Sequence, residues 1–209
     1  MGHVLTVQMG NPAHRDIDLD GMFSLRDQVF RQRLQWSVKS RRGLEQDEYD
    51  ELEPTYMIAQ TASTAVEGCW RLLPTTGPYM LRDTFPQLLR GEQAPCDANV
   101  WEISRFAVMP HSTDGDGQTQ FRNMTLDILR SGYEFAVENG ITHYVAVMGV
   151  AMERFLGRVI GVPMRRFGDK RAQPVGKVVS VACWIDVDER LYQALYQRRK
   201  TAKSKPLLN

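Results

Sequence analysis

The spacing of hydrophobic residues changes repeatedly along the chain, and each change predicts a different element. Residues 3–10, HVLTVQMG, form a short β-type run. Residues 18–36 then carry apolar side chains at helical spacing, which predicts an amphipathic helix. Two further β-type runs, 56–62 and 66–74, predict paired strands around a turn at Ser63 and Thr64.

The second half repeats the alternation of strand and helix. WEISRFAV predicts a buried strand, and residues 121–140 form the clearest helical pattern, with Asn139 and Gly140 as a C-terminal stop. A β-rich run, a second helix ending in glycine and a last core strand follow at 141–149, 150–161 and 178–187. Such an alternation favours one α/β (α+β) domain, built on a single sheet that helices cover.

Two polar segments and the C-terminus interrupt this pattern. Residues 38–56 have no apolar period and predict a long ordered loop, a kind of segment that tends to be functional. Residues 74–97 are rich in proline and predict a loop with a helical turn or two near Phe85 to Leu89. We place one domain at 1–195 and expect a basic, flexible tail at 196–209.

Composition narrows the class of protein. A chain of 209 residues with 43% hydrophobic and 24% charged residues is typical of a soluble globular protein. The net charge of +1 argues against binding to nucleic acid. No run of about 18 apolar residues predicts a membrane span. The three cysteines include no CxxC pair, which indicates neither a disulfide framework nor a zinc site and fits the cytoplasm.

Charged residues inside apolar runs are the main chemical signal. A buried charge is costly unless it is paired, so Glu102 and Arg105 in WEISRFAV need partners. In a regular strand two residues three apart point to opposite faces, so either a bulge re-aims one of them or one faces solvent. Candidate partners in similar contexts are Arg26, Asp47, Asp50 and Arg71.

These six residues comprise three arginines and three carboxylates and would form a neutral cluster. The alternative for Arg26 is a solvated position on a helix, and for Asp47 and Asp50 it is the capping of a loop.

The pattern as a whole resembles the acyl-homoserine lactone synthases, which make quorum-sensing signals in bacteria. The resemblance rests on LRDQVF, Trp36, the acidic pair Asp47 and Asp50, CWRLLPTTGPYML, TFPQLL and WEISRF, and continues more weakly through VAMERFLGRVIGVPMRRFG. It implies a fold similar to the N-acetyltransferases, a twisted mixed sheet flanked by helices with a V-shaped cleft between central strands.

The resemblance also implies a reaction. The family joins an acyl chain, carried as a thioester on acyl carrier protein, to S-adenosylmethionine (SAM), which is a substrate; no cofactor or metal is implied. The amine of SAM attacks the thioester, and its carboxylate then displaces methylthioadenosine to close the lactone.

Roles for individual residues follow from this chemistry. Glu102, directly or through a water, would take the proton from the amine, and Arg105 would pair with the SAM carboxylate or a protein carboxylate. Phe30 and Trp36 would offer ring faces to the sulfonium or the adenine, or else serve as plain core aromatics. The candidate catalytic residues are Glu102, Arg105, Arg26, Asp47, Asp50 and Arg71, and the candidate SAM-binding residues are Phe30, Trp36, Asp47, Arg105 and Phe106.

The second half would serve the acyl donor. The predicted acyl pocket consists of Val145, Val147, Met148, Phe155 and Leu156. Relatives that prefer 3-oxo chains tend to carry a threonine on this strand; Met148 and Gly149 stand there instead, which favours unsubstituted or 3-hydroxy chains. Arg154, Arg158 and Arg166 would dock the acidic carrier protein, or form a solvated helix face.

Two other functions remain open from the sequence. The first is an ordinary acyl-CoA N-acyltransferase, for which the loop DGDGQTQ at 114–120 is a weak phosphate-binding signal. The second is a non-catalytic binding module of the same fold, which predicts that the charged set is broken, whereas every member is present.

Overall fold

The computed structural model describes residues 3–14, 19–61, 64–109 and 117–197. Some predictions lie outside these residues: Ser63 of the expected turn, positions 114–116 of the glycine-rich loop, and 198–209 of the expected tail.

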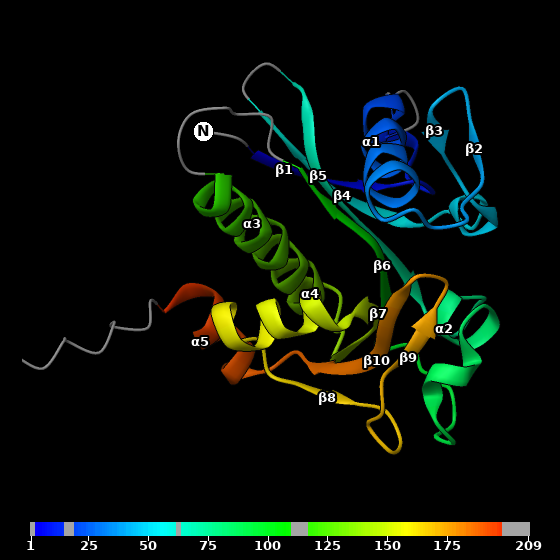
Figure 1. Cartoon of the computed structure of the whole chain (residues 1–209). Helices are drawn as coiled ribbons and strands as arrows, with labels where there is room; N and C mark the ends of the chain where they lie inside the picture. The colour runs from blue at the N-terminus through cyan, green and yellow to red at the C-terminus, as the bar shows by residue number, and fades with distance from the viewer. Residues whose placement is uncertain (1–2, 15–18, 62–63, 110–116, 198–209) are drawn as a thin grey trace, which may run out of the picture.

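An eight-stranded sheet forms the centre of the described structure (Figure 1). Its order is β1-β4-β5-β6-β7-β10-β8, with β9 also paired to β10, and only the contact between β6 and β7 is parallel. This confirms the predicted mixed sheet. The strands are β1 (His3–Gln8), β4 (Thr55–Gln60), β5 (Val66–Pro74), β6 (Val100–Val108), β7 (His143–Gly149), β8 (Met164–Arg166), β9 (Gln173–Val175) and β10 (Val178–Asp186).

Helices cover both faces of the sheet (Figure 1). One face carries α1 (Asp20–Arg26), which continues as the wider π-helical η2 (Asp27–Arg33). The other carries the long α3 (Gly117–Glu138), with α5 (Glu189–Tyr196) against it. A further helix, α4 (Val150–Arg154), follows β7 and runs into the π-helical η5 (Phe155–Ile160). None of the helices in the described ranges has the length and apolarity to cross a bilayer.

Short elements fill the two segments that were predicted as loops. The first contains a small hairpin, β2 (Ser40–Arg41) with β3 (Leu44–Glu45), and the 3-10 turn η3 (Glu48–Glu51). The second contains η4 (Pro86–Leu89), where a helical turn was predicted, and α2 (Met80–Asp83) just before it. A 3-10 turn, η1 (Pro12–His14), follows β1.

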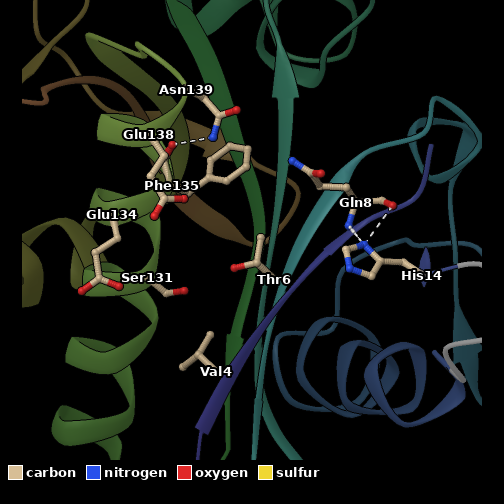
Figure 2. A pocket seen from close by; sticks show the side chains of 9 residues that line it. All are labelled: Val4, Thr6, Gln8, His14, Ser131, Glu134, Phe135, Glu138 and Asn139. Atoms are coloured by element: carbon tan, nitrogen blue, oxygen red, sulfur yellow. Dashed lines mark hydrogen bonds between the residues drawn. The ribbon is translucent and has the colours of Figure 1, made fainter. Parts of the chain in front are cut away.

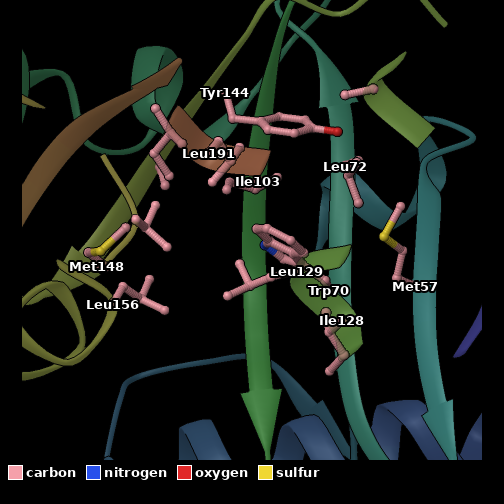
Figure 3. Packing of buried hydrophobic residues seen from close by; sticks show 14 of the residues in the cluster. Met57, Trp70, Leu72, Ile103, Ile128, Leu129, Tyr144, Met148, Leu156 and Leu191 are labelled. Carbon is pink, nitrogen blue, oxygen red and sulfur yellow. The ribbon is translucent and has the colours of Figure 1, made fainter. Parts of the chain in front are cut away.

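Two apolar clusters hold these layers together. The larger lies between the sheet and α3, η5 and α5, and includes Trp70, Ile128, Leu129, Met148 and Leu156 (Figure 3). The smaller packs α1 and η2 against the opposite face. Alternation along the strands separates the two clusters: on β5, Trp70 faces α3 while its neighbours Cys69 and Arg71 face α1.

The sheet opens between its two parallel strands. Pairing between β6 and β7 ends at Ile103 opposite Ala146. Beyond that point β6 continues against β5 to Val108, and β7 continues against β10 to Gly149. The strands therefore diverge, which confirms the predicted V-shaped cleft.

A β-bulge lies where the divergence begins. The register between β5 and β6 shifts so that Arg105 and Phe106 lie opposite the single residue Trp70. Arg105 takes up the bulge with a left-handed backbone at φ 54°, unusual for a residue other than glycine. The bulge rotates the rest of β6 by one position, so Arg105 faces α1 together with Glu102, the first of the two outcomes that the sequence left open.

Candidate active site

A buried ionic cluster lies on the α1 face of the sheet. Arg26 comes from the end of α1, and its side chain is fully buried. Its Nε donates to Glu45 Oε2 at 2.5 Å, and its two terminal nitrogens donate to the two carboxylate oxygens of Asp50 at 2.8 Å. This fork-to-fork geometry is the strongest form of an arginine–carboxylate pair.

Two more arginines complete the cluster. Arg71 Nη1 donates to Asp47 Oδ1 at 2.5 Å and to Asp50 Oδ1 at 2.8 Å. Arg105 Nη2 lies 2.6 Å from Asp47 Oδ2 and 3.0 Å from Glu45 Oε1. We call these six residues the ionic cluster: Arg26, Glu45, Asp47, Asp50, Arg71 and Arg105. Three positive and three negative charges balance, as burial requires.

The loop that supplies the acids is held by its own local geometry. Asp47 is the N-cap of η3: its side chain accepts from Tyr49 N, while Asp50 Oδ2 accepts from Asp47 N. Capping and ion pairing therefore occur in the same residues, although the sequence presented them as alternatives. Asp50 also accepts a hydrogen bond from the Tyr56 hydroxyl at 2.6 Å. Burial opposes ionisation of Asp50, but the hydrogen bonds and charge of Arg26 prevail and lower its pKa.

Glu102 lies apart from the ionic cluster, and Glu45 is the third carboxylate in its place. Both oxygens of Glu102 accept backbone N–H groups at the start of α2, from Met80 at 2.9 Å and Leu81 at 2.6 Å. Its side chain is 1% exposed. Burial raises its pKa to about 7, against the hydrogen bonds that favour the charged form. The expected neutral set therefore exists, but with a different member.

A cavity of about 280 Å³ opens beside the ionic cluster. Asp47 and Arg105 form part of its wall, so two charged members of the cluster border the space. The lining consists of Trp36, Ser37, Val38, Lys39, Asp47, Glu48, Tyr49, Met80, Thr84, Phe85, Arg105, Val175 and Gly176. The Nε1 of Trp36 is buried and has no hydrogen-bond partner among the described residues.

The predicted aromatic residues divide between two positions. Trp36 lines the cavity, and Phe30 packs behind it with ring centroids 5.3 Å apart. The Arg105 guanidinium lies over the Phe30 ring at 5.3 Å. Phe106 is on the opposite face, against Trp70 at 5.8 Å, because the bulge turns it away from Arg105. The geometry therefore does not support Phe106 as a wall of this cavity.

A larger cavity of about 510 Å³ lies elsewhere, between β1 and the C-terminal half of α3 (Figure 2). Its charged side chains are the carboxylates of Glu134 and Glu138, and no residue of the ionic cluster borders it. No arginine or lysine lines it, whereas Arg105 and Asp47 of the ionic cluster line the smaller cavity, which is therefore the candidate active site.

The residues expected to form the acyl pocket lie on both faces of β7. Val145 and Val147 point toward α2 and η4. Met148 and Leu156 belong to the cluster on the α3 face, with Phe155 packed against it. They therefore lie on opposite faces of the sheet, beside the place where β6 and β7 diverge.

The three arginines expected at the docking surface differ in state. Arg154 and Arg158 are exposed on α4 and η5. Arg166 is half-buried and bound by Glu153 through two hydrogen bonds of 2.6 Å. Only the first two can present unneutralised charge to a partner.

Within the part of the chain that is described, no group of three or more His, Cys, Asp or Glu side chains could hold a metal ion. The three cysteines are unpaired, and Cys96 alone among them is exposed.

The cleft between parallel strands, the covering helices and the charged cavity are those of an acyltransferase with the N-acetyltransferase-like fold. A family model described as autoinducer synthase matches residues 12–195. The chain belongs to this family of acyl-homoserine-lactone synthases, acyltransferases that produce quorum-sensing autoinducers.

Individual proteins show the same relationship. The acyl-homoserine-lactone synthase of Aliivibrio fischeri is 43% identical over 175 residues, 84% of this chain and 89% of that protein. The crystal structure of the synthase LasI has a TM-score of 0.81 and 36% identity, covering 94% of this chain and 95% of its own. The CoA-dependent synthase BjaI, solved with SAM and isopentyl-CoA, has a TM-score of 0.76 and 26% identity over 95% and 88%.

These findings decide against a non-catalytic module and against an ordinary N-acyltransferase. They leave the identity of the acyl donor open, because BjaI is described as CoA-dependent.

Proposed function

We propose that the chain binds SAM in the 280 Å³ cavity and transfers to its amine an acyl group from acyl carrier protein, after which the lactone closes and methylthioadenosine leaves. The observation that carries this proposal is that Arg105 and Asp47 of the ionic cluster line one cavity together with the aromatic residues Trp36, Tyr49 and Phe85. The bound SAM reported for BjaI supports it.

The cavity wall matches the charges of SAM. Arg105 Nη1 lies 3.5 Å from Met80 Sδ, and both residues line the cavity, so this edge of the guanidinium is placed for the SAM carboxylate. Asp47 and Glu48 complement the ammonium or sulfonium charge. The rings of Trp36, Tyr49 and Phe85 offer faces to the sulfonium and the adenine.

Glu102 is the proposed proton acceptor, acting through a water. An α-amine has a pKa of about 8, and the pKa of about 7 for Glu102 lies close enough for efficient proton transfer. Its buried oxygens already accept from Met80 and Leu81, so direct contact with the amine would require a third hydrogen bond. Arg26, Asp50, Arg71 and Glu45 act as positioning residues that hold Asp47 and Arg105 at the cavity.

The acyl chain passes through the opening between β6 and β7. Val145 and Val147 border the near side, and Met148, Phe155 and Leu156 line the far side next to α3. Exposed Arg154 and Arg158, carried by the helix that follows β7, then face an acidic carrier protein. A cytoplasmic location stays a prediction, in line with substrates that are made there.

The donor is tested by direct competition. We would give the purified chain SAM with acyl carrier protein and CoA thioesters of the same acyl chain, and quantify acyl-homoserine lactone and methylthioadenosine by mass spectrometry. We expect kcat/KM to be at least tenfold higher for the carrier-protein donor, since charge complementarity speeds association. Equal or better use of CoA would assign the donor to CoA instead, and absence of lactone from either would refute the proposed reaction.

A further inference from the structure

One buried hydroxyl on α3 has no structural partner. The side chain of Thr125 is 0% exposed, and its Oγ1 makes no hydrogen bond. Native proteins rarely leave a buried hydroxyl unsatisfied, because its hydration is lost without replacement. A ligand that brings an oxygen to this position would supply the missing bond.

The position of Thr125 on its helix directs it toward the opening in the sheet. Phe121, Thr125 and Leu129 are four residues apart and share one stripe of α3. Phe121 contacts Phe155 of η5, with ring centroids 5.3 Å apart. Leu129 is buried in the α3-side cluster with Met148 and Leu156 (Figure 3). The stripe therefore faces η5 and the end of β7.

The neighbouring stripe fixes which part of the sheet lies below. Ile128 and Met124 are the side chains of α3 nearest to Gly68 of β5, and Gly68 pairs with Val108 at the far end of β6. This is the half of β6 that has lost its pairing with β7. Thr125 thus lies on α3, on the side of the sheet where β6 leaves β7, next to the proposed path of the acyl chain.

Phe121 and Leu129, the side chains that share this stripe of α3 with Thr125, are apolar. Phe106, Phe121 and Phe155 are half-buried and pack against the cluster that contains Met148 and Leu156. Such a wall suits a hydrocarbon chain, and a single hydroxyl in it is placed to recognise a polar substituent. The absence of a hydroxyl at the end of β7 therefore does not leave the pocket without one, because α3 supplies it from the other side.

We propose that Thr125 selects acyl chains that carry an oxygen at position 3, as a 3-oxo or a 3-hydroxy group, by hydrogen bonding to that oxygen. The hydroxyl donates to a ketone, and it donates to or accepts from an alcohol. An unsubstituted chain leaves Oγ1 unsatisfied, which is the origin of the discrimination. The inference rests on the proposed function, because it requires the acyl chain to pass between β6 and β7.

The test compares three donors of one chain length, unsubstituted, 3-oxo and 3-hydroxy, on the same carrier protein, offered together to the purified chain with SAM. Thr125→Val removes the hydroxyl at constant shape, and Thr125→Ser keeps it. Ile128→Val, one turn further along α3, controls for altered packing. Lactone ratios are read by mass spectrometry, and circular dichroism confirms that each variant is folded.

We expect the wild type to favour at least one oxygen-bearing donor over the unsubstituted one. Thr125→Val should lower that preference about tenfold, the effect of one lost hydrogen bond. Its kcat/KM for the unsubstituted donor should stay within about twofold, and Thr125→Ser should retain the preference. Which of the two oxygen-bearing donors the wild type prefers shows whether the hydroxyl of Thr125 recognises a ketone or an alcohol.

Three results would overturn the inference: a wild type that prefers the unsubstituted chain, an unchanged preference in Thr125→Val, or an equal loss with all donors, which is the mark of a purely structural hydroxyl. In each of these cases lactone is still made, so the proposed function survives. No lactone from any donor would instead remove the proposed function and this inference together.

Discussion

Glu45 shows how much a single carboxylate can organise. It joins two arginines from distant parts of the chain, Arg26 from α1 and Arg105 from β6, and is fully buried. The sequence showed it beside Leu44, within the same acidic segment as Asp47 and Asp50. It was missed because Glu102 already balanced the charges. Only the contacts show that Glu102 bonds to α2 and leaves the third place to Glu45.

Removing the charge of Glu45 should be severe. Glu45→Gln leaves Arg26 and Arg105 with less compensating charge in a buried site, so we expect a loss of about 3–5 kcal/mol in the free energy of unfolding. Urea denaturation measures it. The control is Asp127→Asn, whose partner Arg130 is at the surface and whose loss should be about 1 kcal/mol or less. Equal effects of the two variants would refute the structural role of Glu45.

Glu102 should make stability depend on pH. Its pKa is raised from 4.5 to about 7 in the folded chain, so the folded state holds a proton that the unfolded state releases earlier. Stability from this group is fully present below pH 4.5 and is lost as pH rises toward 7, by up to about 3 kcal/mol. Glu102→Gln lacks this titration, so the advantage of wild type over variant should shrink between pH 5 and pH 8 in urea denaturation.

The same substitution separates a proton acceptor from a positioning residue. If Glu102 takes the proton, kcat/KM of the wild type should fall as the pH drops below 7. Glu102→Gln should have a much lower kcat/KM and should not show this acid-side decrease. A variant with a lower kcat/KM that still decreases below pH 7 would show that Glu102 acts by holding α2.

At the scale of elements, periodicity predicted what is long and left out what is short or irregular. Six strands of the central sheet, β1, β4, β5, β6, β7 and β10, and the long helix α3 were found, because their apolar residues extend over many positions. β8 and β9, with three residues each, and α5, with eight, were missed because too few residues show a period. Tyr196, placed in the tail, instead ends α5 and packs on Tyr133 and Tyr192.

Irregular backbone explains the remaining differences. The position of the bulge in β6 depends on the pairing with β5 and could not be read from WEISRFAV alone. The bulge directs Arg105 toward the cavity and Phe106 to the opposite face. The orientation of both side chains therefore follows from one inserted residue.

A matched pair of variants measures the strain at this bulge. Arg105→Gly and Arg105→Ala both remove the guanidinium, but only alanine keeps the cost of the left-handed backbone at φ 54°. We expect both to abolish turnover and the glycine variant to be more stable by about 1 kcal/mol, as measured by thermal or urea unfolding. If alanine is as stable as glycine, the strand relaxes and the bulge is not fixed by its surroundings.

At the scale of the molecule, the near-zero net charge of +1 conceals separate local charges. The ionic cluster is neutral and buried, while Arg154 and Arg158 remain at the surface. Arg166, expected to join them, is neutralised by Glu153. The overall charge therefore says little about either the site or the docking surface, and contacts must decide which arginines are available.

Charge reversal at the two exposed arginines tests docking. Arg154→Glu with Arg158→Glu should lower kcat/KM for the carrier-protein donor by about tenfold or more and reduce its dependence on salt, with little change for a CoA donor. Steady-state kinetics at low and high ionic strength provide the measurement. Arg190→Glu, exposed on α5, is the control. A similar loss for the double variant with the carrier-protein donor, for the double variant with the CoA donor and for Arg190→Glu would indicate a general electrostatic effect rather than a docking surface.

The divergence of β6 from β7 also bears on how such signals diversify. The sheet separates two regions: the ionic cluster and Glu102 lie on one side, and α3 with Thr125, together with η5, lies on the other. On the proposed path of the acyl chain, substitutions on the second side change which acyl chain is accepted, while the residues around the SAM cavity stay the same. Related synthases can therefore come to make different signals through a few substitutions on the α3 side of the sheet. The enzyme stays active at each step.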